Sequence, residues 1–247
     1  MRRASQSLHV LGLLAVVAAC QKDASPIRTT SQSGTQDSPA AQAVDSRGHS
    51  LVRVVNAASD GKTVDVELGS RTFFPGIASG GVTDYQEVDD HLARFSVIAT
   101  AAKAGTVALR VDEMLSDGLR YTAFVITEDV SKRGLRVVQD DVIPDSGKAR
   151  LRVIHAAPGG PEFDVRSVTS ADKLFAGVNF STEAGYLDLE PALMAFELRA
   201  AGKEPVLLRI PTMQLRPGTA TTIVITGAGK LGYFVFTDAM LKQVAER

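Results

Sequence analysis

The sequence predicts an all-β protein with two tandem immunoglobulin-like β-sandwich repeats, placed after a lipoprotein signal and a disordered tether. Three observations lead to this fold class: segments of alternating apolar and polar residues, frequent Gly and Pro turn signals, and an internal duplication of the chain. Alternation with period two is typical of half-buried strands. A duplicated strand pattern predicts two units that fold alike.

Residues 1–19 are predicted to be a lipoprotein signal peptide. Arg2 and Arg3 supply its positive start, residues 8–17 an apolar stretch, and small residues precede Cys20. The apolar stretch is shorter than the roughly 20 residues of a transmembrane helix. We therefore expect a lipid anchor at Cys20 that holds the protein, by acyl chains such as palmitate, to a membrane of the cell envelope.

Cys20 is the only cysteine of the chain, so no internal disulfide can support the fold. Two alternatives stay open for it: an ordinary secretory signal with a cysteine near the cleavage site, or a single reactive thiol. Residues 20–49 are rich in Ser, Gln, Thr and Ala, and predict a disordered tether. Gln21 is not the aspartate that favours inner-membrane retention, so the outer membrane is the expected location.

The rest of the chain divides into two predicted sandwich repeats, 50–143 and 148–238, followed by a short C-terminal helix or tail at 239–247. Strands are expected at 50–56, 94–99 and 148–155, where apolar and polar residues alternate. Segments 121–127 and 221–226 are β-branched and apolar throughout, which predicts central strands buried on both faces. About seven short strands per repeat would give an immunoglobulin-like sandwich. A joint with Pro144 predicts limited hinge freedom between the repeats.

Each repeat opens on a shared motif, R-V-V-N-A-A-S-D from Arg53 and R-V-I-H-A-A-P from Arg152. The motif resembles R-V-x-H-A-S-P-D-x-P-x-V-D-V, the repeat opening of a bacterial secreted family catalogued as domain of unknown function 4397. The resemblance covers nearly all of residues 50–238. It implies an extracytoplasmic tandem β-sandwich protein of unknown activity and transfers no catalytic residue. The chain departs from the family pattern at Asn56, Ser59 and Gly159.

Two positions of the shared motif carry polar side chains that are expected to form hydrogen bonds within the fold. Asp65 and Asp164 each precede a valine in the second strand of a repeat. We expect their carboxylates to accept hydrogen bonds from backbone N–H groups of a turn, with a ligand role as the alternative. His155 has Asn56 as its counterpart, so a neutral hydrogen-bonding side chain is sufficient there, and His155 is predicted to stabilise a turn.

No catalytic set emerges, and the chain is predicted not to be an enzyme and to need no cofactor. None of the four histidines has metal-ligand spacing, and His91 and His155 lie far apart in the sequence. Residues 76–80 place a serine one position too late for a nucleophile elbow. Residues 227–230 lack the spacing of a phosphate-binding loop and predict a hairpin turn instead.

The remaining candidate for a functional site is a group of acidic residues. Asp140, Asp141 and Asp145 flank the joint, and tandem extracellular sandwiches often bind calcium there. They are the candidate Ca²⁺ site, with a solvated acidic strand end as the alternative. A second acidic group, Asp112 with Glu113 and Asp117, is expected in a loop of the first repeat.

These expectations lead to a non-enzymatic, lipid-anchored envelope protein that presents a tandem β-sandwich module or binds an envelope protein partner. The chain has 27 basic and 28 acidic side chains and lacks the basic stripe that nucleic acid requires. The longest irregular stretches, 69–81 and 168–177, are the expected binding loops. Their aromatic residues, Phe73, Phe74 and Phe175, are expected to cap the core rather than to anchor a partner. The alternative function is a periplasmic or surface small-ligand or carbohydrate-binding protein, which the absence of Trp disfavours.

Overall fold

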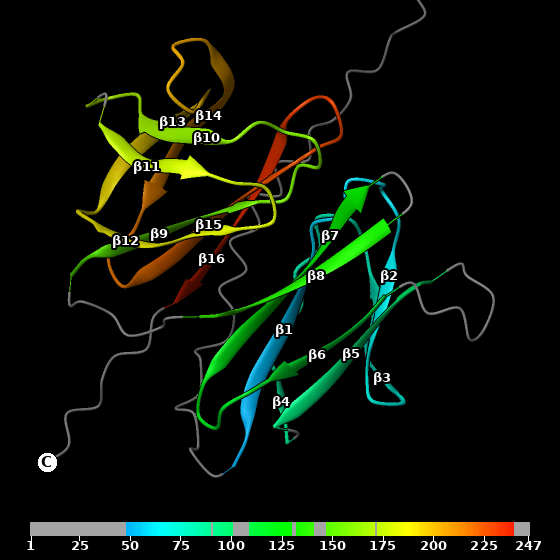
Figure 1. Ribbon diagram of the computed structural model, residues 1–247. Coiled ribbons are helices and arrows are strands. Elements are labelled where there is room, and N and C mark those ends of the chain that lie inside the picture. Colours follow the sequence, from blue (N-terminus) through cyan, green and yellow to red (C-terminus); the bar gives the residue numbers. More distant parts are fainter. Residues whose placement is uncertain are drawn as a thin grey trace, which may run out of the picture. The chain divides into compact units, whose positions relative to one another are not determined.

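Strands account for every regular element in the described part of the protein. A computed structural model describes residues 48–89, 91–100, 109–129, 132–140, 147–170 and 172–239. These residues form sixteen strands arranged as four sheets of four strands each. The predicted all-β fold class with two sandwich-like sheet pairs is therefore confirmed (Figure 1).

Repeat 1 consists of the first eight strands, in two sheets with the orders β4-β1-β7-β8 and β3-β2-β5-β6. We call the first of these inner sheet 1 and the second outer sheet 1. The bounds are β1 Ser50–Asn56, β2 Val64–Leu68, β3 Arg71–Ile77, β4 Gln86–Val88, β5 Leu92–Ala99, β6 Leu109–Met114, β7 Arg120–Asp129 and β8 Lys132–Gln139.

Repeat 2 reproduces this arrangement with the orders β12-β9-β15-β16, inner sheet 2, and β11-β10-β13-β14, outer sheet 2. The bounds are β9 Ala149–His155, β10 Phe163–Ser167, β11 Lys173–Val178, β12 Glu183–Leu189, β13 Ala192–Ala200, β14 Val206–Leu215, β15 Thr219–Thr226 and β16 Gly232–Ala239. The described residues all fall within one compact unit of the chain.

The first strand of each repeat pairs in parallel with a strand far along the chain. In repeat 1, β1 pairs with β7, and in repeat 2, β9 pairs with β15. All other strand pairs are antiparallel. The predicted central strands at 121–127 and 221–226 lie within β7 and β15, each flanked by two partners, which explains their continuous apolar character.

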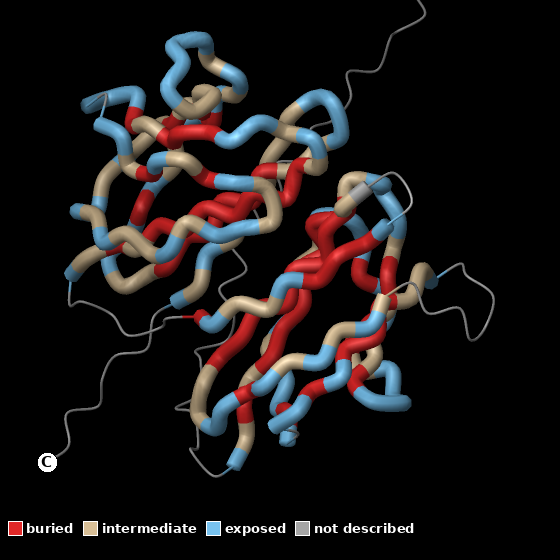
Figure 2. Tube along the Cα trace, viewed as in Figure 1, coloured by how far each residue is buried: buried red, intermediate tan, exposed pale blue. Residues whose placement is uncertain are grey.

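A separate apolar core lies between the two sheets of each repeat (Figure 2). Alternate residues of the strands supply it. In β1 and β9, Val52, Val54, Leu151 and Val153 point inward and are fully buried. Arg53 and Arg152 occupy the intervening positions, so by strand alternation their side chains leave on the opposite face of each inner sheet. That opposite face is where the candidate site lies.

Several sequence-based expectations need correction. Segments 69–81 and 168–177 are not long irregular loops, because the edge strands β3 and β11 occupy at least half of each. Edge position is what allows Pro75 to stand inside β3. Asp112 and Glu113 lie in strand β6 rather than in a loop. Each repeat has eight strands rather than about seven.

The structure describes only a few residues near the predicted domain boundaries. His49, placed in the tether by composition, accepts a hydrogen bond from the N–H of Gly118 at 2.8 Å and so belongs to the sandwich. Ala239, expected to start a helix, is the last residue of strand β16. Residues 1–47, the joint at 141–146 and the tail 240–247 lie outside the described residues. The described residues contain no helix with the length and hydropathy of a membrane span.

Candidate functional site: the interface between the repeats

The two inner sheets contact each other through their outward faces. Seven buried side chains from both repeats form a third apolar cluster: Val55, Ala57, Phe124, Ile126, Ile154, Ala156 and Val224. Phe234 and Phe236 of β16 pack against it. Apolar side chains on both faces of these sheets explain why β7 and β15 carry no alternation.

A buried ion pair crosses this interface from repeat 2 to repeat 1. The Arg152 side chain is fully buried, and its Nη2 lies 2.8 Å from Oδ1 of Asp140. The two atoms are off the line of a good hydrogen bond, so the contact is an ion pair. The other carboxylate oxygen, Oδ2, accepts hydrogen bonds from the hydroxyls of Thr122, at 2.6 Å, and Tyr85, at 2.8 Å.

A second ion pair crosses in the other direction. Arg53 donates from Nη1 and Nη2 to the two carboxylate oxygens of Asp238, at 2.6 and 2.7 Å. Its Nε donates to Thr122 at 2.8 Å. Such bidentate geometry is among the strongest arrangements for an Arg–carboxylate contact. Asp238 is less enclosed than Asp140, with 14% of its side chain exposed against 1%.

The two ion pairs occupy equivalent positions in the two repeats. In the β1–β7 and β9–β15 ladders, Arg53 is opposite Thr122 and Arg152 is opposite Thr222. Asp238 is opposite Ala220, and the N–H of Asp140 bonds to the carbonyl of Arg120, the residue that matches Ala220. Each repeat therefore gives its motif arginine to the other repeat and receives the other's arginine on its own aspartate.

Aromatic rings cover both guanidinium groups. Arg53 lies 4.5 Å from the ring centre of Tyr85 and 4.7 Å from that of Phe236. Arg152 lies 4.6 Å from the ring centre of Tyr186, the counterpart of Tyr85. Such cation–π contacts add to the stabilisation of buried arginines.

Charge pairing overcomes the effect of burial on these groups. Burial alone would raise the pKa of Asp140, but the charges of Arg152 and Arg53 and two hydroxyl hydrogen bonds lower it below its usual range. Burial would lower the pKa of Arg53, but its neighbours, Tyr85 and Asp238 first, raise it above the usual arginine value. Burial raises the pKa of the Tyr85 phenol. Arg53 and Asp140 are therefore both charged at neutral pH, although they are buried.

The last residue of each arginine-bearing strand, Asn56 in β1 and His155 in β9, holds the turn that follows, as predicted for His155. The Asn56 amide donates to the carbonyls of Lys62 and Ile77, both at 2.9 Å, and accepts from Ala58 N–H at 3.2 Å. His155 Nδ1 accepts from Ala157 N–H at 3.3 Å, which leaves Nε2 to donate to the Pro161 carbonyl at 3.2 Å. Burial lowers the pKa of His155, which keeps the imidazole neutral.

The two motif aspartates accept backbone hydrogen bonds, as expected, but from a neighbouring strand rather than a local turn. Asp65 accepts from Gly76 N–H at 2.6 Å and Asp164 from Gly177 N–H at 3.0 Å. Both glycines have positive φ, 66° and 63°, and lie beside ladder irregularities between β2 and β3 and between β10 and β11. The aspartates therefore fix a bulge in each outer sheet.

The remaining candidate residues are placed as follows. Phe74 and Phe175 are buried in the two cores and Phe73 packs against the first, so they cap the cores as predicted. Asp112 pairs with Arg94 on the surface. His91 lies on the surface of repeat 1 beside Asp117, whereas His155 is buried in repeat 2.

The calcium prediction rests on residues that the structure describes only in part. Asp140 is committed to Arg152, Thr122 and Tyr85, and Asp141 and Asp145 lie outside the described residues, as does Cys20. Among the described residues, no group of three or more His, Cys, Asp or Glu could hold a metal ion. A Ca²⁺ site at the joint stays a prediction.

Sequence reasoning missed the arginines. Arg53 and Arg152 begin the shared motif, and Tyr85 and Tyr186 follow them at similar separations in the two repeats, so the signal is present in the sequence. A duplicated arginine on the outward face of a strand would have to be buried by something, and the other repeat is what buries it.

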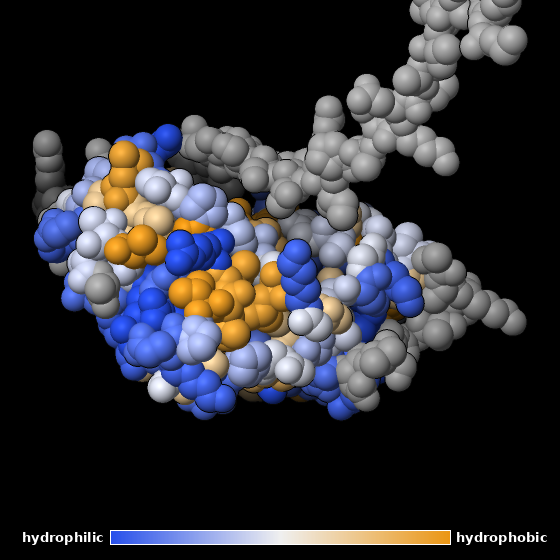
Figure 3. Space-filling model, turned by 90° about the horizontal axis from the view of Figure 1, so that it is seen from above, coloured by the Kyte–Doolittle hydropathy of each residue, from blue (hydrophilic) through white to orange (hydrophobic). Residues whose placement is uncertain are grey.

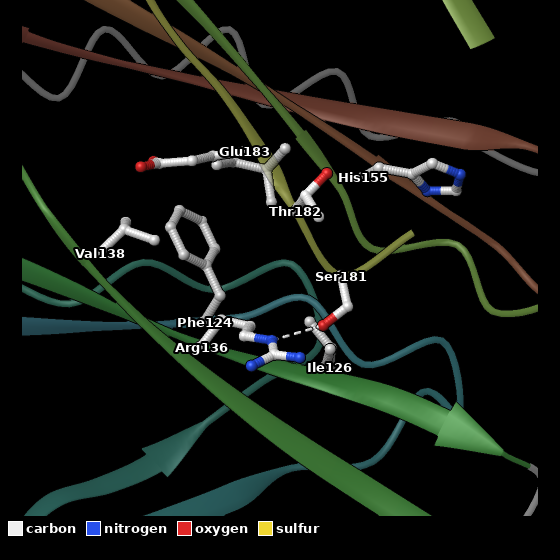
Figure 4. A pocket seen from close by; sticks show the side chains of 9 residues that line it. Phe124, Ile126, Arg136, Val138, His155, Ser181, Thr182 and Glu183 are labelled. Carbon is white, nitrogen blue, oxygen red and sulfur yellow. Dashed lines mark hydrogen bonds between the residues drawn. The ribbon is translucent and has the colours of Figure 1, made fainter. Parts of the chain in front are cut away.

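A pocket opens at one side of this interface, with a volume of about 400 Å³. Its apolar floor and polar rim come from both repeats, and Figure 4 shows the guanidinium of Arg136 hydrogen-bonded to Ser181 and the His155 ring directed away from the others. The lining residues are Phe124, Ile126, Arg136, Val138, Ile154, His155, Ser181, Thr182 and Glu183.

The fold and the paired interface define the protein as a tandem β-sandwich protein whose two repeats exchange buried arginines. Residues 50–166 match the family model described as "Domain of unknown function (DUF4397)". Over these residues the match confirms the resemblance that the repeat motif indicated. The match spans repeat 1 and the opening of repeat 2, so it includes both motif arginines. No curated protein matches the chain.

Two solved structures show distant similarity to the chain. A proposed cell adhesion protein from Bacteroides ovatus ATCC 8483 is 11% identical, with a TM-score of 0.26, over 80% of this chain and 100% of the other. The Bacillus anthracis TIE protein is 9% identical, with a TM-score of 0.21, over 75% of this chain and 51% of the other. These values are too low to support a functional argument.

Proposed function

We propose that the protein is a non-enzymatic, lipid-anchored envelope protein whose tandem β-sandwich module is presented to a protein partner. The observation that carries the proposal is the interface between the repeats. Buried ion pairs in both directions and an apolar cluster join the two sandwiches into one module. A joined pair of sandwiches on a tether is suited to holding binding surfaces at a distance from the membrane.

The described surface supports contact with a partner. Large apolar side chains with at least 40% exposure are Leu92, Met114, Val168, Leu193 and Leu207. Leu92 and Met114 are opposite each other in the β5–β6 ladder. On the face seen in Figure 3, hydrophobic side chains gather in a patch bordered by hydrophilic ones. Exposed apolar patches of this kind often mark interaction sites.

The anchor is tested by intact mass and membrane partition of the expressed protein against Cys20→Ser. A diacyl or triacyl mass on Cys20, lost together with membrane association in the variant, would support the proposal. Gln21→Asp is a matched control, because it should keep the lipid and alter only the membrane in which the protein is retained. An unlipidated, soluble mature protein would overturn the anchoring proposal.

Small-ligand binding, the alternative function, is favoured by one observation, the pocket at the interface. Its apolar floor is not suited to carbohydrate, because the exposed rings that stack on sugars are not among its lining residues. Tyr85 and Tyr186 are not available either, since they cover the buried arginines. A ligand for this pocket must therefore be more apolar than a sugar.

A further inference from the structure

The pocket lies where equivalent positions of the two repeats carry different side chains. In the β7–β8 ladder, Phe124 is opposite Arg136, and in the β15–β16 ladder its counterpart Val224 is opposite Phe234. Arg136 thus corresponds to Phe234. By the same ladders Val138, opposite Thr122, corresponds to Phe236, opposite Thr222.

The strand on the other wall of the pocket differs in the same way. Glu183 is opposite Ile154 in the β12–β9 ladder, and Val82 is bridged to Val55 at the matching place in repeat 1. One half of the interface is therefore lined by Val82, Phe234 and Phe236, all packed against the apolar cluster. The other half has Glu183, Arg136 and Val138 at these places, and it contains the pocket.

Ser181, at the pocket rim, has an unusual backbone. Its φ is 62°, and it is the single non-glycine residue with positive φ in the described part of the chain. Gly80 is its counterpart, since each N–H bonds to the carbonyl of the motif Asn or His. A glycine adopts this conformation without strain, whereas a serine does not. Strain of this kind concentrates at functional sites.

The strained serine positions a cation. Its hydroxyl accepts a hydrogen bond from Nε of Arg136 at 2.6 Å. Among the described residues, no carboxylate forms an ion pair with Arg136. The other charged group on the rim, Glu183, does have a counter-charge, because its Oε2 lies 3.7 Å from Nη1 of Arg152. Of the two charged side chains on the rim, Arg136 is therefore the one without an ion-pair partner among the described residues.

We propose that this pocket binds a small ligand with an apolar body and a single carboxylate, with the body on Phe124, Ile126 and Val138 and the carboxylate on Arg136. An apolar pocket with one positioned cation binds such a ligand through burial and a charge-assisted hydrogen bond. The inference depends on the small-ligand function and is independent of the lipid anchor. A free alkyl carboxylate and the C-terminal residue of a peptide share this chemistry.

The test is a titration by NMR or calorimetry on full-length Cys20→Ser protein, which removes lipid attachment without changing a described residue. The probes are octanoate, N-acetyl-leucine and, as the oppositely charged control, octylamine. Saturable binding of a carboxylate with a Kd of about 1 mM or tighter is expected, and octylamine should bind at least about tenfold more weakly. Octanoate alone would identify a free alkyl acid, and N-acetyl-leucine alone a peptide C-terminus.

Variants locate the binding site. Arg136→Gln should weaken carboxylate binding about tenfold, whereas Arg110→Gln, an exposed arginine on outer sheet 1, should leave it unchanged. Val138→Phe introduces the ring that Phe236 supplies on the other side and should abolish binding. Ser181→Gly should weaken binding without lowering the melting temperature, because it removes the strain together with the hydroxyl. Absence of saturable binding, or equal binding of octylamine, would overturn the proposal.

Discussion

The two halves of the interface between the repeats share their charged centre and differ at their sides. Both repeats supply an arginine, a tyrosine, a threonine and an aspartate in matching ladder positions. The flanking positions hold aromatic rings on one side and Arg136 with Val138 on the other. The comparison separates a charged centre that both halves share from side positions that have diverged between the two repeats.

The largest expected effect comes from the two aspartates of the centre. Asp140→Ala should destabilise the protein by about 3–5 kcal/mol, because the buried Arg152 then keeps only the more distant and partly exposed Glu183, at 3.7 Å, as a counter-charge. Asp238→Ala should cost less, about 1–3 kcal/mol, because Arg53 keeps Thr122 and lies 4.0 Å from Asp140. Urea unfolding of both variants measures the difference. Equal losses would show that the two ion pairs are energetically alike despite their different burial.

A smaller effect is expected at the sides. Phe236→Val replaces the ring with the residue that its counterpart Val138 supplies at the pocket. It should lower the free energy of unfolding by about 1–2 kcal/mol through lost ring packing. Val138→Ala, at the edge of the existing pocket, should cost less than about 1 kcal/mol, because little close packing is lost. Thermal unfolding compares the two. A larger loss of stability for Val138→Ala than for Phe236→Val would contradict the placement of Val138 at the edge of a pocket.

The bulge aspartates offer a matched pair outside the interface. Asp164 accepts Gly177 N–H and also pairs with Lys173 at 2.7 Å, and the hydrogen bond from Lys173 lowers the pKa of Asp164. Asp164→Ala should cost about 1–2 kcal/mol and Asp65→Ala about 0.5–1 kcal/mol. Chemical denaturation checks this order, with Asp112→Ala on the surface as a control that should change little.

The smallest effect is a pH dependence present in one repeat only. The folded-state pKa of His155 is lowered by burial, so the unfolded chain takes up a proton first as the pH falls below about 6.5. Stability is therefore complete above that pH and is lost on acidification. His155→Asn, which copies Asn56, should reduce the loss between pH 7 and 5.5 by about 1 kcal/mol or less. An unchanged slope in the variant would assign the loss to other groups.

The strands of the motif could be predicted from the sequence because their information is local. Alternation identified β1, β5 and β9, and the continuous apolar runs identified the central strands β7 and β15. The edge strands β3 and β11 were mistaken for loops because Pro75, Gly76 and Gly177 are loop formers in a single sequence. A proline at a sheet edge and glycines at bulges are compatible with strands, and only pairing reveals them.

The candidate site was less predictable, because its partners belong to different repeats. Asp140 was noticed as part of an acidic cluster, and its role as the counter-charge of Arg152 depends on a contact across the interface. The alternation of apolar and polar residues within one repeat does not indicate which sheet face contacts the other repeat. The pocket depends on the difference between Val138 and Phe236, which acquires meaning only when the two ladders are superposed.

The exchange of arginines gives each repeat a self-complementary face, as in a two-fold symmetric dimer of identical subunits. In such a dimer every substitution appears twice, so a pocket on one side would bring an identical pocket on the other. Joining the two copies in one polypeptide removes that constraint. A single chain can then close one side of its interface and keep the other open, so that the pocket occurs once per molecule.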